Sequence, residues 1–205
     1  MNRTTLIVLK TLAWIACLWL FARLMWGAFT NDLGVDPIAT IAFSTGLATL
    51  RLLLITLAIT PVRRLSPRLA WLVKFRRLLG LFAFFYGTLH MLTWVALYNN
   101  FDVQAMLDDV AKRRFITVGM AAWLLMLPLA ATSTNWAIRK LGGKNWNRLH
   151  KLIYAAAVCG VIHYWWQVKT GVLTPLRTTV ILAVLLLARP VTTWMQRCKA
   201  RAVAD

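Results

Sequence analysis

Three histidines carry most of the chemistry that this 205-residue chain can offer. His150 and His163 occur in the stretch 145–167, and His90 lies in another apolar run, 77–98. Imidazole binds metals and titrates near neutral pH. An ionisable side chain at membrane depth is costly, so it is by default a candidate functional residue. We therefore expect the histidines to define the function.

The other reactive residue types support few alternatives. All six acidic residues are aspartates, so chemistry that needs paired carboxylates or a carboxylate-rich metal site has little to draw on. The three cysteines are scattered and form no CxxC pair, which argues against a thiolate metal site. We find no Gly-rich phosphate loop and no evident site for chemistry on a substrate.

The depth of the histidines within the predicted helices favours haem. His90 and His163 each lie about 13 residues into a helix that runs outward, which is roughly 20 Å at 1.5 Å per residue. The two imidazoles can therefore meet at one level as axial ligands of a single haem iron. A zinc site would need three or four ligands. The alternative, a transmembrane histidine that only hydrogen-bonds across helices, stays open at this stage.

The elements that must position these residues are membrane helices. Hydrophobic residues make up 60% of the chain and the mean hydropathy is +0.65, too apolar for a soluble domain. The hydropathy pattern predicts an all-α integral membrane protein, a six-transmembrane-helix bundle forming a single domain over residues 1–205. The expected helices cover about 6–29, 38–60, 78–98, 115–132, 150–167 and 176–194.

The distribution of the cations predicts the topology. The net charge is +18, and the cations cluster in the loops 61–77 and 133–151 and in the C-terminal tail. The positive-inside rule places these segments and both termini in the cytoplasm. Clustering at helix ends favours topogenesis and anionic lipids as partners rather than nucleic acid. The outer loops, Thr30–Pro37, Asn99–Arg114 and Lys169–Pro175, are then the candidates for docking a partner.

Four arginines are candidate cofactor contacts. Arg51 falls near the middle of a predicted span with no carboxylate in the apolar runs, so a haem propionate is a candidate partner. The alternatives are solvation in a polar cavity and displacement toward the membrane interface. Arg76, Arg77 and Arg148 can hold anionic groups of haem, flavin or quinone at the inner surface. Lipid headgroups and topogenesis explain these three arginines as well.

A set of residues in the segment 132–163 resembles the transmembrane ferric-reductase-like domain. The residues that carry the likeness are Thr132, Ser133, Arg139, Leu141, Gly142, Trp146, Leu149, His150, Tyr154 and His163. Within that superfamily the chain is most similar to haem-binding membrane subunits of bacterial periplasmic methionine-sulfoxide reductase systems. The resemblance covers essentially the whole chain, including the lack of the cytoplasmic FAD/NADPH domain of eukaryotic relatives.

The resemblance implies a non-catalytic electron-transfer subunit in the bacterial inner membrane, with one or two b-type haems and an associated FMN. Electrons would come from the quinone pool or a cytoplasmic flavin reductase. They would pass to a periplasmic molybdopterin enzyme that reduces methionine sulfoxide in oxidised proteins. His90, His150 and His163 match the haem-linked histidines of the family.

Relatives with two haems use two histidine pairs, but here Arg76 and Arg77 occupy the level opposite His150. This departure leaves three roles for His150: a ligand of a second haem, alone or with an unusual partner, or a contact for flavin or quinone. Two functions of other classes also remain open, a small proton-coupled transporter and a non-redox anchor subunit. A reduced-minus-oxidised visible spectrum of the purified chain distinguishes these functions from haem-based electron transfer, because only a haem protein shows b-type bands.

Overall fold

The computed structural model describes residues 2–168 and 172–202, and within them the chain is helical with no strand. The predicted all-α class is confirmed for these residues, whereas the predicted outer turn 169–175 lies partly outside them. The elements in chain order are α1 (Arg3–Thr30), α2 (Pro37–Leu65), η1 (Pro67–Phe75), α3 (Arg76–Leu92), η2 (Thr93–Tyr98), α4 (Val103–Lys112), α5 (Arg114–Ala131), α6 (Asn135–Leu149), α7 (Leu152–Gln167) and α8 (Leu173–Ala202).

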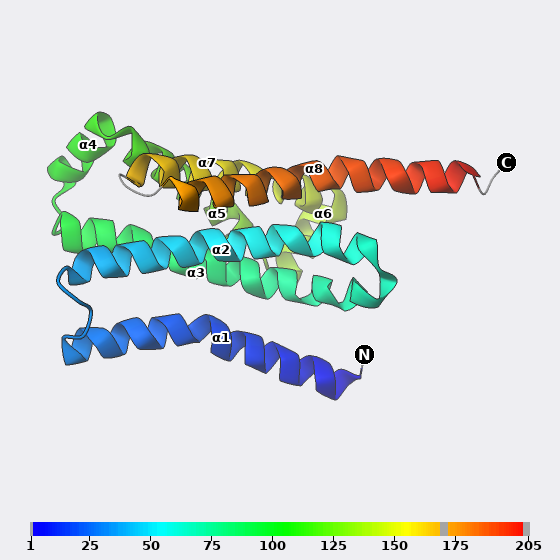
Figure 1. Ribbon diagram of the computed structural model, residues 1–205, viewed down its shortest axis with the longest axis horizontal. Helices are drawn as coiled ribbons and strands as arrows, with labels where there is room; N and C mark the ends of the chain where they lie inside the picture. Colours follow the sequence, from blue (N-terminus) through cyan, green and yellow to red (C-terminus); the bar gives the residue numbers. More distant parts are fainter. Residues whose placement is uncertain (1, 169–171, 203–205) are drawn as a thin grey trace.

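The long helices lie roughly along one common axis (Figure 1). One end of the bundle holds the α1–α2 turn, α4 and the start of α8. The other end holds the start of α1, the α2–η1 turn, α6 and the end of α8. The closest helix pairs are α2 with α3 and α5 with α7. Each histidine-bearing helix, α3 or α7, therefore packs against a partner helix that can hold its side chain.

The core forms around α2. One buried cluster joins Leu50, Leu54 and Leu57 of α2 to α7 and α8, and another joins Leu53 to α3, α5 and α7. Ala156 and Ala157 of α7 have no exposed surface. Small residues at such contacts let helix backbones approach closely, which is how helices pack in a membrane where burial from water contributes little.

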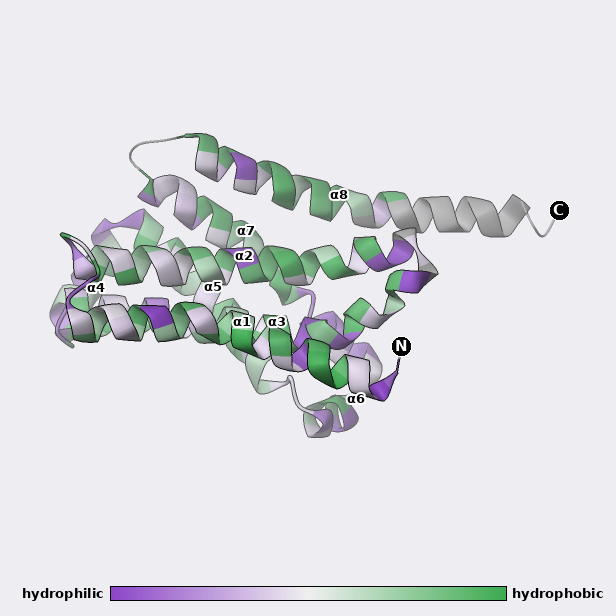
Figure 2. Cartoon of the chain, turned by 60° about the horizontal axis from the view of Figure 1, so that its bottom comes forward, coloured by the Kyte–Doolittle hydropathy of each residue, from purple (hydrophilic) through white to green (hydrophobic). Residues whose placement is uncertain are grey.

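In the part of the chain that the structure describes, four segments are long and apolar enough to cross a membrane: Arg3–Thr30, Pro37–Arg64, Arg68–Tyr98 and Arg114–Ala131. Hydrophobic residues run along these helices, and hydrophilic ones gather near α6 and the end of α2 (Figure 2). The chain is thus a multi-pass membrane protein. The apolar part of α8, Leu173–Ala188, and the 16-residue α7 are shorter, so the six-span count stays a prediction.

Two segments expected to be loops contain polar helices instead. Helix α4 lies within 99–114, where the Asp102 side chain accepts hydrogen bonds from the backbone N–H groups of Gln104 and Ala105. Helix α6 lies within 133–151, where the Thr134 hydroxyl accepts from the Ala137 N–H. A capped helix needs no apolar run, so a hydropathy pattern does not detect it.

The expectation that His150 and His163 share one helix is wrong. His150 is the C-cap of α6, and α7 begins at Leu152. The Lys151 N–H donates to the Arg148 carbonyl at 3.2 Å and the Tyr154 N–H to the Lys151 carbonyl at 3.0 Å. These bonds span three residues rather than four, so they interrupt the α-helical ladder between α6 and α7.

Candidate functional site

The imidazoles of His90 and His163 lie side by side between two helix pairs. Their ring centroids are 5.9 Å apart and the ring planes cross at 81°. His90 belongs to the last turn of α3, and His163 lies near the end of α7. Both helices run toward the end of the bundle that holds α4, which brings the two side chains to the same level (Figure 1).

Each of these imidazoles is fixed by a backbone carbonyl of the neighbouring helix. His90 Nδ1 lies 2.8 Å from the Ala42 oxygen in α2, and His163 Nδ1 lies 2.7 Å from the Phe115 oxygen in α5. Since a carbonyl oxygen can only accept, Nδ1 must be the protonated nitrogen of both rings. The neutral Nε2 then keeps its lone pair, as in metal-binding histidines whose other nitrogen donates to a carbonyl.

The donor set fits the axial positions of a haem iron. Two neutral imidazoles from different helices supply two nitrogen ligands, and a porphyrin supplies the remaining four. Within the described ranges, no three histidine, cysteine or acidic residues gather into a group that could hold a bare metal ion. The arrangement therefore matches a metal that arrives with its own equatorial ligands better than a zinc ion.

His150 lies at the opposite end of the bundle. Its ring stacks on Trp146 with a centroid separation of 3.7 Å and an interplanar angle of 24°. His150 Nδ1 lies 3.1 Å from the Trp146 carbonyl, so this histidine too has Nδ1 as its donor. The Trp146 indole in turn donates to the Thr132 carbonyl at 2.9 Å, which anchors the stacked pair.

Two buried nitrogens at this end of the bundle have no hydrogen-bond partner among the described residues. They are His150 Nε2, an acceptor in this tautomer, and Arg76 Nε, a donor. Burial lowers the pKa of His150, and the nearby Arg76 charge lowers it further. Hydrogen bonding to the backbone of Trp146 and of Leu129 opposes this change. Buried polar atoms are normally hydrogen-bonded, so a bound group is expected here. Arg76 Nε could donate to such a group and His150 Nε2 could accept from it.

The other predicted arginines are placed differently. Arg77 Nη1 donates to Asn135 Oδ1 at 2.8 Å, which ties the start of α3 to α6. Arg51 and Arg148 have exposed side chains. Only Arg76 among the four is partly buried beside a histidine. The proposed contacts of all four arginines with cofactors stay predictions.

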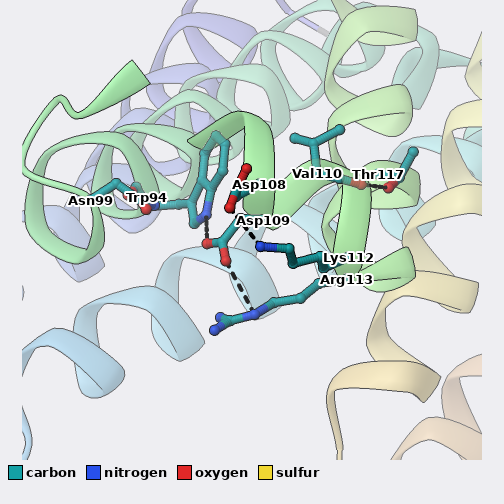
Figure 3. A network of polar contacts seen from close by, with 8 residues as sticks. All are labelled: Trp94, Asn99, Asp108, Asp109, Val110, Lys112, Arg113 and Thr117. Carbon is teal, nitrogen blue, oxygen red and sulfur yellow. Dashed lines mark hydrogen bonds and ion pairs between the residues drawn. The ribbon is translucent and has the colours of Figure 1, made fainter. Parts of the chain in front are cut away.

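A polar network attaches helix α4 to η2, the segment that directly follows the His90 helix (Figure 3). Trp94, four residues after His90, donates from Nε1 to Asp109 Oδ2 at 3.2 Å. Asp109 Oδ1 pairs with Arg113 Nε at 3.1 Å. Trp94 is the second residue of η2, a π-helical segment, and such segments are frequent at functional sites. Helix α4 thus bridges α3 and the start of α5, where Phe115 holds His163.

Sequence reasoning missed the groups that hold the imidazoles. The carbonyls of Ala42 and Phe115 carry no sequence signal, because every residue has a carbonyl group. The two rings lie against Gly46 and Gly119, and these glycines were a usable sequence signal. A glycine within a helix lowers stability relative to alanine, so glycines inside long apolar runs invite a packing explanation.

Comparison with known proteins gives consistent matches. Residues 45–161 match the family described as "Ferric reductase like transmembrane component". This range includes His90 and His150, and His163 lies just beyond it. The chain is 48% identical over 201 residues, 97% of this chain and 92% of the relative, to the "Protein-methionine-sulfoxide reductase heme-binding subunit MsrQ" of Herminiimonas arsenicoxydans.

Two further proteins with the same description are similar. The one from Ralstonia nicotianae is 50% identical over 158 residues, covering 77% of this chain and 72% of the relative. The one from Bordetella pertussis is 47% identical over 195 residues, covering 94% of each. These alignments extend well beyond the segment 45–161.

Proposed function

This chain belongs to the ferric reductase-like transmembrane family and, within it, to the MsrQ haem-binding subunits, and from that membership we propose that it is a haem b electron-transfer subunit of a protein-methionine-sulfoxide reductase. The chain resides in the bacterial inner membrane with six spans and both termini in the cytoplasm. It performs no chemistry on methionine sulfoxide itself.

The paired imidazoles of His90 and His163 carry this proposal. They come from separate helices, lie 5.9 Å apart and both direct the Nδ1 proton to a carbonyl. His90 and His163 would hold the haem iron through Nε2, and the haem would supply a carrier of one electron at a time. The Ala42 and Phe115 carbonyls hold the rings in the ligating tautomer.

The position of this pair supports outward electron transfer. Both histidines lie toward the end that bears α4, whereas the cation-rich segments around η1 and α6 lie at the other end. Under the positive-inside rule the histidine pair is on the periplasmic side. The electron acceptor is a periplasmic molybdopterin reductase that repairs oxidised proteins, and the outer loops are its docking region.

The inner end suits a cofactor that receives electrons. Arg76 Nε offers a donor for a propionate, a phosphate of FMN or a quinone carbonyl, and His150 Nε2 offers a lone pair to iron or to a ligand proton. Electrons enter here from the quinone pool or a cytoplasmic flavin reductase. Arg51, Arg77 and Arg148 are secondary candidates for anionic cofactor groups.

The decisive experiment is a reduced-minus-oxidised visible spectrum of the purified full-length chain. We expect sharp b-type bands. His90→Ala and His163→Ala should each abolish the low-spin bis-imidazole signal while the protein still inserts, and His150→Ala, the matched control, should leave that signal in place. A colourless wild-type protein would refute electron transfer and favour a transporter or an anchor subunit. Retention of the full signal in both variants would refute the ligand assignment.

A further inference from the structure

The same structural device holds both imidazoles, and it occurs on two different helices. On α2 the carbonyl of Ala42 accepts from His90, and the His90 ring lies on Gly46, four residues later. On α5 the carbonyl of Phe115 accepts from His163, and the His163 ring lies on Gly119, again four residues later. Each device thus consists of a carbonyl followed by a glycine at i+4.

The close contacts explain why the second position is glycine. A Cβ atom on Gly119 would lie 2.6 Å from His163 Nδ1 and 2.8 Å from its Cε1. A Cβ atom on Gly46 would lie 3.0 Å from His90 Cε1 and 3.1 Å from its Nδ1. Both imidazoles would have to move. Neither ring can move freely, because its Nδ1 is hydrogen-bonded to a carbonyl of the helix that carries the glycine.

Helix geometry links the two parts of the device. Residues i and i+4 lie one above the other on a helix face, and the carbonyl of residue i points along the axis toward residue i+4. An imidazole resting on the bare backbone at i+4 therefore meets that carbonyl with its Nδ1. A side chain at i+4 would lift the ring away from the carbonyl and lengthen the bond.

Gly80 provides a helical glycine without this constraint. Gly80 in α3 also lies within a helix, yet a Cβ there would meet only Thr56 Cγ2, at 4.0 Å. Glycine in a helix interior is less favourable than alanine, since it loses more backbone entropy on folding. At Gly46 and Gly119 this loss of helix stability is accompanied by space for an imidazole ring. At Gly80 no imidazole lies within contact distance.

We infer that Gly46 and Gly119 are positioning residues that set the Nδ1 hydrogen bonds of the two imidazoles. Through these bonds they set the redox potential of the haem that the imidazoles hold. This inference rests on the proposed function. A hydrogen bond from Nδ1 to a carbonyl raises the basicity of the imidazole and strengthens its donation to iron. Stronger donation favours the ferric state. Lengthening that bond therefore shifts the midpoint potential to a more positive value.

The test compares Gly46→Ala, Gly119→Ala and the control Gly80→Ala in the purified haem-loaded chain. The readouts are the midpoint potential from a redox titration and the low-spin signal in electron paramagnetic resonance. We expect a positive shift and an altered low-spin signal in Gly119→Ala, and a smaller change of the same sign in Gly46→Ala, where the contact is less severe. Gly80→Ala should match the wild type.

The outcomes separate this inference from the function on which it rests. A wild-type chain without haem bands contradicts the proposed function. A haem-loaded wild type whose potential and low-spin signal are unchanged in both Gly46→Ala and Gly119→Ala contradicts only the inference. If Gly119→Ala fails to insert, Gly46→Ala decides: a potential equal to that of Gly80→Ala overturns the inference, and a positive shift supports it.

Discussion

The hydroxyl group of Tyr86 reaches the backbone of α1. It donates to the Cys17 carbonyl and accepts from the Phe21 N–H at 3.2 Å, although these two backbone groups would bond to each other in a regular helix. Tyr86 is only 1% exposed. A side chain inserted into the ladder bends a helix, and α1 changes direction along its length (Figure 1). Tyr86 therefore joins α1 to α3.

Replacing Tyr86 by Phe should weaken this joint. The variant loses both hydrogen bonds of the hydroxyl while the ring still fills its place, so we expect the chain to lose about 1 kcal/mol of stability. Thermal unfolding in detergent measures the loss. Tyr98→Phe is the control, because Tyr98 is 53% exposed at the end of η2. Equal melting temperatures for the two variants would show that the hydroxyl does not hold α1.

At the residue scale, the sequence predicted which histidines meet but not what holds them. The distance of His90 and His163 from their helix starts placed both at one depth, and the structure brings their rings within 5.9 Å. Their carbonyl partners depend on which helices are neighbours, a property of the tertiary structure. The expectation that His150 shares a helix with His163 was wrong because only the hydrogen-bond pattern defines the turn between α6 and α7.

At the element scale, α4 depends on one of its two adjacent aspartates. Asp109 accepts from Trp94 and pairs with Arg113, so it connects α4 to η2. Asp108 pairs with Lys112 on the surface, and Lys112 lowers the pKa of Asp108 without attaching α4 to the bundle. The two carboxylates thus provide a matched pair of substitution sites, one anchored and one not.

Asp109→Ala should loosen α4 more than Asp108→Ala. Losing the Trp94 bond, at about 1 kcal/mol, corresponds to roughly fivefold faster amide exchange in α4 by local opening. Hydrogen–deuterium exchange of the purified protein measures this rate. The Asp108→Ala variant should stay near the wild-type rate, since an exposed ion pair contributes little. Equal exchange rates in both variants would mean that Asp109 does not anchor the helix.

Hydropathy detects the membrane-spanning helices of this chain but not its polar helices. Four predicted spans correspond to helices long and apolar enough to cross a membrane, because the bilayer demands a long apolar run. Helices α4 and α6 escaped prediction because caps and charged residues define them instead.

At the scale of the whole molecule, α7 and α8 decide the number of spans. The 16 residues of α7 cover about 24 Å, less than the roughly 30 Å of a typical hydrocarbon core. Yet α7 packs along α5 and α2, which are long enough to cross. A short helix enclosed by longer ones can cross where the bilayer thins locally or where polar ends reach the interface.

Labelling of single cysteines in intact cells tests this topology, in a chain whose three native cysteines are replaced by alanine. Val35→Cys lies in the α1–α2 turn and should react from outside, whereas Lys144→Cys in α6 should react only after the membrane is opened. Val172, 63% exposed before α8, is the deciding position. If α7 and α8 both cross, Val172→Cys labels like Val35→Cys. If neither crosses, it labels like Lys144→Cys, and His163 loses the membrane depth that its pairing with His90 requires.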